Sequence, residues 1–141
     1  MAHLFPSPEW TQAFADAVNN NEVYRTHGKA WTFGSVAMVV SKNDDIGIKD
    51  DMGMILDVHE GECRGAELVH GMDAVMGSPF VIVAPYERWK KVIDGELDPI
   101  KAMMEGKLKM TKGHLPTMLR FVLSSRALVT SATAVPTEYI A

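Results

Sequence analysis

The hydrophobic pattern of this chain changes its period at Pro85, and this change limits the possible folds more than any other feature. Before Pro85, apolar residues tend to alternate with polar ones over residues 30–84, as they do in half-buried strands. After it, Trp89, Val92 and Ile93 recur at the spacing of one helical face. Strands grouped ahead of helices predict an α+β architecture, with one mostly antiparallel sheet covered by helices on one side.

Local patterns predict where these elements begin and end. Strands are expected over residues 30–41, 52–59, 63–70, 79–84 and 107–110, the second and third forming a hairpin. A helical arm is expected over residues 7–28, broken or re-capped at 19–21. Further helices are expected after residues 85 and 98, and one long helix containing residues 115–128 closes the chain. Because no internal repeat or low-complexity linker is present, residues 1–141 are predicted to form one domain.

Composition and charge exclude several classes of protein. Hydrophobic residues make up 47% and charged residues 23% of the 141 residues, as in ordinary globular proteins. With 14 Lys and Arg against 18 Asp and Glu, the net charge of −4 argues against nucleic acid and against electrostatic docking on anionic membranes. A single cysteine, Cys63, excludes an intramolecular disulfide and indicates a reducing compartment. Since no signal peptide or membrane-spanning stretch is visible, we expect a cytoplasmic location.

The side chains best suited to catalysis or metal binding lie between Asp57 and Cys63. Asp57 and His59 share one face of a strand, and Glu62 and Cys63 follow across a turn, so they could converge on a metal ion. Hairpin turns, however, are rich in polar residues for backbone reasons alone, and this interpretation is favoured. Common nucleotide-binding and hydrolase motifs are absent from the sequence. The sequence therefore predicts no metal site, no catalytic residue and no cofactor.

An ordered series of short motifs runs from residue 80 to residue 121. It consists of the strand Val81-Ile82-Val83, then Tyr86-Glu87-Arg88-Trp89, Ile93-Asp94-Gly95-Glu96-Leu97-Asp98-Pro99 and Met103-Met104-Glu105-Gly106-Lys107-Leu108-Lys109-Met110. The series resembles the sterol carrier protein type-two family, whose domain has a strand, a helix, a Gly-x-x-Asn/Asp-Pro turn, a helix and a Gly-Lys-Leu-Lys strand. The family's final helix follows a glycine, matched here by Gly113, although Lys112 is an extra residue before it. Together with the single cysteine and the absence of a signal peptide, the series makes the chain resemble a stand-alone prokaryotic member of this family.

The resemblance implies a roughly five-stranded sheet with an apolar tunnel between the sheet and the helices. Methionine suits such a wall because its unbranched side chain re-packs around different ligands, and eight of the ten methionines lie between residues 52 and 118. The same residues would also suit an ordinary core, so their role as ligand contacts depends on the resemblance. The positions that match the tunnel and its lid are Trp89, Ile93, Ile100, Met103, Met104, Leu108, Met110, Leu115, Met118, Leu119 and Val122.

The function implied by the resemblance is that of a non-enzymatic lipid carrier. Its ligand would be a fatty acid, a fatty acyl-CoA or a sterol-like molecule, and its other expected partners are an enzyme and, at most transiently, a membrane. The C-terminus lacks a Ser-Lys-Leu signal, so a peroxisomal role is not implied. One alternative is a small enzyme that uses Asp57, His59 or His114 as acid–base groups. Another is an accessory subunit whose apolar surface binds a lipid- or CoA-metabolising enzyme.

Overall fold

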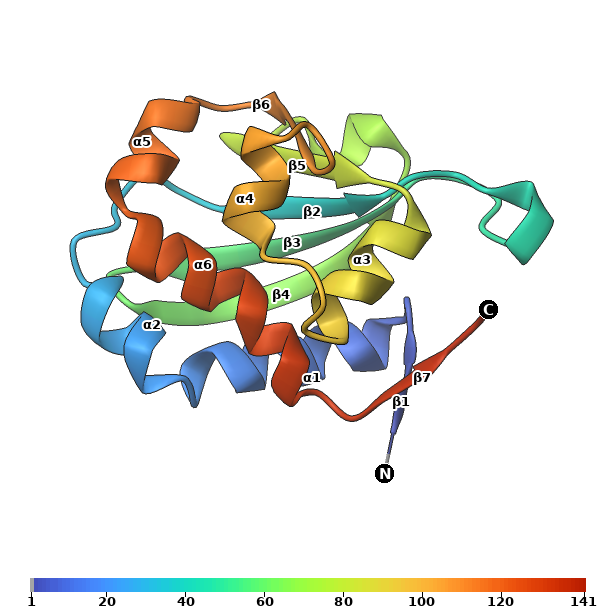
Figure 1. The fold of residues 1–141 in the computed structure, drawn as a ribbon, viewed down its shortest axis with the longest axis horizontal. Helices are drawn as coiled ribbons and strands as arrows, with labels where there is room; N and C mark the ends of the chain where they lie inside the picture. The colour runs from blue at the N-terminus through green and yellow to red at the C-terminus, as the bar shows by residue number, and fades with distance from the viewer. Residues whose placement is uncertain (1) are drawn as a thin grey trace.

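The computed structural model describes residues 2–141, in which a layer of helices covers one face of a five-stranded sheet (Figure 1). The α-helices of this range are α1 Pro8–Asn19, α2 Glu22–His27, α3 Tyr86–Ile93, α4 Pro99–Met104, α5 Leu115–Arg120 and α6 Val122–Thr130. Short 3-10 helices occur at Asp44–Ile46, Met72–Val75 and Ser131–Ala134. The strands of the main sheet are β2 Val36–Val40, β3 Met52–His59, β4 Glu62–His70, β5 Phe80–Ala84 and β6 Lys109–Lys112.

The main sheet confirms the predicted fold class. Its strand order is β4-β3-β2-β5-β6, and only the central β2–β5 pair is parallel among the four neighbouring pairs. The central strand β2 is buried on both faces, with Val36, Met38 and Val40 in the core beneath the helices. On the opposite face Val39 packs with Val75 of the 3-10 helix. The helix layer and the sheet therefore enclose one main core, and a smaller cluster lies behind the sheet.

The N-terminal helical arm forms as its capping residues predict. The side chain of Ser7 accepts a hydrogen bond from the Trp10 amide at 3.0 Å and begins α1. Asn21 starts α2, because its side-chain oxygen accepts hydrogen bonds from the amides of Val23 at 3.0 Å and Tyr24 at 3.2 Å. The asparagine run thus ends one helix and caps the next, as expected.

Side chains of α1 cover the exposed edge of β4. The Asn19 amide group donates to the Cys63 carbonyl at 2.9 Å and accepts from the Cys63 N–H at 2.8 Å, much as a neighbouring strand would. Gln12 donates to the carbonyl of Ala66 farther along the same strand. These bonds satisfy part of an otherwise open strand edge and hold α1 beside the sheet.

Two predicted elements are shorter or displaced in the structure. The strand expected over residues 30–41 is limited to Val36–Val40, because Gly34 has a positive φ of 102° and Trp31 turns back to bond its amide to the Gly28 carbonyl. The strand expected over residues 107–110 begins at Lys109 instead. The amides of residues 107 and 108 bond to the Ala102 carbonyl and so complete the end of α4.

The prediction of a single long C-terminal helix is wrong, because the structure has two helices there. The backbone of Phe121 has φ −104° and ψ 42°, outside the helical region, and it divides α5 from α6. The Phe121 ring lies 5.6 Å from the rings of Trp31 and Phe33, so it is held in an aromatic cluster at this break. Figure 1 labels α5 and α6 as two segments, with α6 in front of the strands and α5 beside their ends.

A pair of terminal strands was not predicted from the sequence. β1 (His3–Phe5) and β7 (Thr137–Tyr139) pair in parallel, so the two ends of the chain lie side by side (Figure 1). The indole of Trp10 donates to the Thr137 hydroxyl at 2.9 Å and ties this pair to α1. Three-residue strands carry too little alternation to be recognised from their own sequence.

Candidate ligand-binding site

The region where a tunnel was expected is a closely packed interface between the helices and the sheet. Apolar side chains of α1, α3 and α6 meet those of β2 and β3 in one continuous core. Two of the cavities enclosed there have volumes of only about 10 Å³ each. Pockets for small molecules usually measure roughly 300–1,000 Å³. The structure therefore does not show an open tunnel.

One of these cavities, which we call the hydroxyl cavity, is lined by three hydroxyl-bearing residues among apolar ones. It lies where α2, α5 and α6 meet the inner faces of β2 and β3. Its lining residues are Tyr24, Trp31, Val36, Val58, Met118, Ser124, Ser125 and Leu128. The hydroxyl cavity thus combines an apolar wall with a few polar groups, as ligand sites commonly do.

The three hydroxyl groups differ in how they are satisfied. Ser124 donates to the Phe121 carbonyl at 3.1 Å, and Ser125 donates to the Met118 carbonyl at 3.2 Å. Tyr24 is only 2% exposed, and its hydroxyl has no hydrogen-bond partner within residues 2–141. Burial, with a smaller contribution from nearby Cys63, raises the pKa of Tyr24 far above its ordinary value. The Tyr24 hydroxyl is therefore neutral and free to donate and to accept.

Tyr24 is held in this position from both ends of its short helix. The side-chain nitrogen of Asn21, the cap of α2, donates to the Ala127 carbonyl at 3.3 Å and to the Ser131 hydroxyl at 3.0 Å. At the other end, Gly61 of the β3–β4 turn approaches so closely that a Cβ there would lie 2.6 Å from the Arg25 carbonyl oxygen. α2 is consequently fixed between α6 and the hairpin.

The second cavity, which we call the apolar cavity, lies at the other end of the interface and has only apolar and aromatic walls. Its lining residues are Phe5, Trp10, Phe14, Met38, Met54, Trp89, Val92, Ile93, Val129 and Ala132. The rings of Phe5 and Trp10 lie 4.7 Å apart, and those of Trp10 and Phe14 lie 5.1 Å apart. The Trp89 indole is satisfied by the Val39 carbonyl at 2.8 Å. The apolar cavity therefore offers a ligand no free polar group from these indoles.

The residues predicted to line a tunnel are distributed over several environments. Met118 lines the hydroxyl cavity, whereas Trp89 and Ile93 line the apolar cavity. Ile100, Met103 and Leu108 are buried in the core, and the partly buried members are Met110, Leu115, Leu119 and Val122. Met104, also predicted as a tunnel or lid residue, is 67% exposed and does not line the helix–sheet interface in this structure. A ligand-binding role for the other ten residues remains a prediction.

Every lining residue of the hydroxyl cavity except Met118 lies outside the predicted set of tunnel and lid residues. Tyr24 and Trp31 come from segments interpreted only as a helical arm and a strand, and Ser124 and Ser125 are polar residues within an apolar helix pattern. The one sequence signal was the pair of serines on the inward side of the last helix, close to Leu128. Apolar spacing alone cannot identify such a polar group in a ligand wall.

An aromatic cluster closes the end of the interface beside the hydroxyl cavity. The ring of Trp31 lies 5.2 Å from Phe33, 5.0 Å from Phe80 and 5.6 Å from Phe121. The Arg120 guanidinium lies 5.1 Å from the centre of the Phe121 ring, within cation–π range. Because Phe33 is 40% exposed while Trp31 is buried, this cluster reaches from the hydroxyl cavity to the surface.

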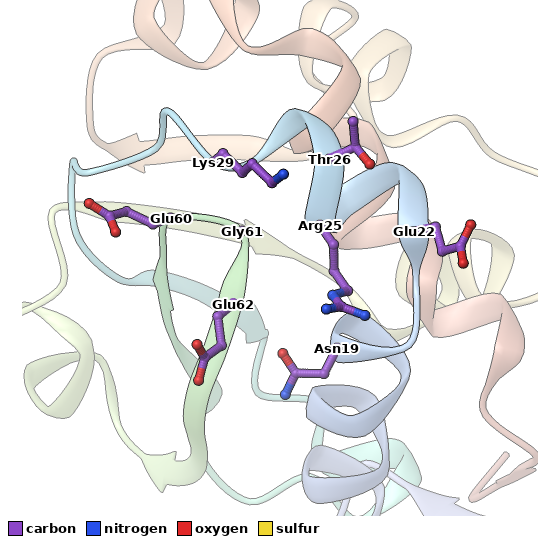
Figure 2. Close-up of a pocket in the computed structure, with 8 residues that line it drawn as sticks. All are labelled: Asn19, Glu22, Arg25, Thr26, Lys29, Glu60, Gly61 and Glu62. Carbon is purple, nitrogen blue, oxygen red and sulfur yellow. The ribbon is translucent and has the colours of Figure 1, made fainter.

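A wider polar cleft lies on the outer side of α2 (Figure 2). It has a volume of about 580 Å³, and its residues are Asn19, Glu22, Arg25, Thr26, Lys29, Glu60, Gly61 and Glu62. In Figure 2 Arg25 projects from α2 toward Asn19, whereas Glu22 and Glu60 point toward opposite sides. Such an open cleft, with charges of both signs, is not suited to binding the hydrocarbon chain of a lipid.

The structure does not assemble the alternative chemical site around Asp57. Asp57 is exposed and pairs with Arg64 at 3.0 Å, whereas Cys63 is buried and donates to the Gly65 carbonyl at 3.4 Å. Burial raises the pKa of the Cys63 thiol. His114 lies elsewhere, at the start of α5, with its ring nitrogen 2.8 Å from the Thr117 hydroxyl. Across residues 2–141, no three His, Cys, Asp or Glu side chains are grouped so that they could hold a metal ion.

The described helices are also too short to cross a bilayer. α1, which has 12 residues, is the longest of those in residues 2–141, whereas a membrane-spanning helix needs about 20 apolar residues.

Comparisons with known proteins agree with the fold. The crystal structure of sterol carrier protein 2 is 32% identical, with a TM-score of 0.85 over 92% of this chain and 97% of that chain. A solution structure from Thermus thermophilus, of a conserved hypothetical protein described as possibly a sterol carrier protein, is 31% identical. Its TM-score is 0.83, over 94% of this chain and 90% of that one.

A more distant structure shares the fold alone. The apo form of sterol carrier protein 2 from Yarrowia lipolytica is 13% identical, with a TM-score of 0.52 over 86% of this chain and 88% of that chain. Comparison with curated proteins gives no match. The model of the SCP-2 sterol transfer family matches residues 34–121, which is more than half of the chain. The chain therefore belongs to the SCP-2 sterol transfer family.

Proposed function

We propose that residues 1–141 act as one lipid-binding domain, which takes up a single lipid between its helix layer and its sheet. Membership of the family supports a role in lipid binding or transfer. The observation that carries the proposal is the continuous apolar interface, which contains cavities at both ends although its walls are in contact. A lipid of ordinary length would occupy this interface by separating its two layers.

The layers would separate most easily at α5 and α6. Of the five buried side chains of α6, Leu128 and Val129 are large and apolar, whereas the other three, two serines and an alanine, bury little apolar surface when the helix packs on the sheet. The corresponding face of α1 buries Trp10 and Phe14. Burial of apolar area contributes about 25 cal/mol per Å², so lifting α6 costs less than lifting α1. The break at Phe121 would let α5 and α6 move as separate segments.

The ligand classes we propose are fatty acids, fatty acyl-CoA and sterol-like molecules, held without chemical change. The removal of apolar ligand surface from water would drive binding, offset by the cost of ordering the ligand. Asp57 and His59 lie on β3 and are paired with Arg64 and Glu60, whereas His114 lies at the start of α5. The three acid–base candidates are thus not gathered in one site, which supports a carrier rather than an enzyme. We propose that the protein works in the cytoplasm and passes its lipid to an enzyme or, transiently, to a membrane.

A matched pair of methionines tests this proposal. Met118 lines the hydroxyl cavity, whereas Met104 is exposed, and both are changed to glutamine. Burying an unpaired amide costs about 1–3 kcal/mol. Met118→Gln should therefore weaken displacement of a fluorescent fatty acid about tenfold or more, since roughly 1.4 kcal/mol corresponds to a factor of ten. Met104→Gln should stay within about twofold of the unmodified protein.

Circular dichroism provides the check that both variants are folded. Equal lipid binding by the two folded variants would contradict the assignment of the site to the helix–sheet interface. Failure of the unmodified protein to bind any long-chain lipid would contradict the carrier function itself.

A further inference from the structure

We propose that the hydroxyl of Tyr24 binds the polar end of the lipid, and that the preferred ligand carries a neutral hydroxyl group rather than a carboxylate. This inference rests on the proposed carrier function and adds a ligand class and an orientation to it. The lipid would lie with its hydroxyl end in the hydroxyl cavity and its apolar body along the interface toward the apolar cavity.

The first observation is the unsatisfied hydrogen-bonding capacity of Tyr24. Within residues 2–141 its hydroxyl is the buried side-chain polar atom that has no partner, although Tyr24 is only 2% exposed. An unpaired buried hydroxyl is costly, and a native structure that keeps one needs an explanation. The other deeply buried tyrosine, Tyr86, has its hydroxyl 3.1 Å from the Ala141 carbonyl. A ligand that both accepts from and donates to Tyr24 would remove this cost.

The second observation is the direction of the neighbouring serine bonds. Ser124 and Ser125 use their protons on the carbonyls of Phe121 and Met118, so their oxygen lone pairs remain as acceptors. The hydroxyl cavity consequently offers one free donor, on Tyr24, and several acceptors. An alcohol matches this set because it accepts one hydrogen bond and donates another.

The third observation is the absence of a positive charge on the cavity wall. The eight residues that line the hydroxyl cavity include no lysine, arginine or histidine. A carboxylate placed there would lose its hydration with no cation to pair with it, which is far more costly than burial of a neutral hydroxyl. The cationic side chains Arg25 and Lys29 line the polar cleft instead (Figure 2).

The size of the cavity fits this role. Its volume of about 10 Å³ is that of one small polar group, while the lipid body needs the separated layers. A single bound water would also give the Tyr24 hydroxyl a hydrogen-bond partner. If a water fills the cavity in this way, Tyr24 should have no influence on which lipid binds.

The test compares three ligands of equal chain length in the unmodified protein and in Tyr24→Phe. The ligands are 1-dodecanol, 1-chlorododecane and dodecanoate at pH 8, each measured by displacement of a fluorescent fatty acid. The unmodified protein should bind dodecanol about tenfold more tightly than chlorododecane, the size expected when a ligand satisfies a buried hydroxyl. It should also bind dodecanol more tightly than dodecanoate. Tyr24→Phe should abolish the preference for dodecanol while its affinity for chlorododecane changes less than about twofold.

Tyr86→Phe provides the matched control, because it removes a buried hydroxyl that lies outside the hydroxyl cavity. It should retain the preference for dodecanol. The inference is overturned if Tyr24→Phe keeps that preference, or if the unmodified protein favours dodecanoate. Binding of all three ligands with equal affinity would leave the carrier function standing and remove the Tyr24 anchor. Binding of none would remove both.

Discussion

Aromatic rings pack against one another at both ends of the helix–sheet interface, but the two ends differ in the polar groups that their cavities contain. At the apolar cavity, the aromatic rings of Phe5, Trp10 and Phe14 lie within 4.7–5.1 Å of their neighbours. At the hydroxyl cavity, the covering helix presents Ser124 and Ser125, and a tyrosine hydroxyl is left unpaired. At the apolar cavity the indoles of Trp10 and Trp89 are hydrogen-bonded, whereas at the hydroxyl cavity the unpaired hydroxyl of Tyr24 costs stability. A ligand bound at the hydroxyl cavity can supply the hydrogen-bond partner that the Tyr24 hydroxyl lacks.

α1 and α6 also differ in the interactions that hold them in place. α1 is anchored to the edge of β4 by the paired Asn19–Cys63 hydrogen bonds. α6 is held by an ion pair between Arg126 and Asp98 at 3.2 Å, which links it to α4, and by the side-chain nitrogen of Asn21, which donates to its Ala127 carbonyl. A surface ion pair stabilises by at most about 1 kcal/mol. Because two of the buried side chains of α6 are serines, whereas α1 buries Trp10 and Phe14, we expect α6 to be the more easily displaced helix.

The largest expected effect comes from breaking the packed end. Phe14→Ala removes a ring that is 1% exposed, and it should lower the free energy of unfolding by about 3–5 kcal/mol in urea denaturation. Phe33→Ala, at the exposed rim of the other end, should cost less than half as much. Equal losses at the two sites would contradict the contrast between the two ends.

A smaller effect is expected where the hairpin supports α2. Gly61 has a φ of 82°, and a Cβ there would lie 2.6 Å from the Arg25 carbonyl oxygen. Gly61→Ala should therefore lower the free energy of unfolding by about 1–3 kcal/mol and weaken lipid binding, because Tyr24 moves with α2. Gly65→Ala, with no atom within 4 Å of the added methyl, should change stability by less than about 0.5 kcal/mol. A folded Gly61→Ala protein with unchanged stability and binding would show that the hairpin does not position Tyr24.

A still smaller effect is expected at the ion pair over α6. Partial burial acts to raise the pKa of Asp98, but hydrogen bonds from Arg126 and the Ile100 amide outweigh it and hold the pKa below its ordinary 3.8. A lowered folded pKa means that this stabilisation is present above pH 3.8 and is lost as the pH falls through the folded value.

Asp98→Ala also removes the cap of α4, so it should lower the free energy of unfolding by about 1 kcal/mol at pH 7. Amide hydrogen exchange should become faster in α6 than in α1. The exposed Asp45→Ala serves as the control and should change neither quantity. If α1 and α6 exchange equally fast in Asp98→Ala, then the ion pair has no special influence on α6.

The smallest effect on stability is expected at Tyr24. Because its hydroxyl has no partner, Tyr24→Phe should leave the free energy of unfolding unchanged or raise it by up to about 1 kcal/mol. Tyr86→Phe should lower it by about 0.5–1.5 kcal/mol, since it loses the bond to Ala141. A marked loss of stability in Tyr24→Phe, measured by urea denaturation without lipid, would mean that the hydroxyl already has a partner in the protein.

The sequence predicted what depends on local pattern and missed what depends on distant contacts. The hairpin of β3 and β4, the cap at Ser7 and the turn before α4 all follow from neighbouring residues, and the structure confirms them. The break at Phe121 arises from its packing against Trp31, which lies ninety residues away in the chain. Tyr24 becomes a polar group in an apolar wall only because α6 and the hairpin enclose it. Neither contact leaves a periodic signal.

Native mass spectrometry of the protein purified from its expression host tests the central claim most directly. The claim is that one lipid fits between the helix layer and the sheet. The expected result is a protein carrying one lipid per chain, which is lost on organic extraction and regained when a long-chain alcohol is added. A protein that shows only its unliganded mass, both as purified and after incubation with a long-chain alcohol or fatty acid, would contradict the account.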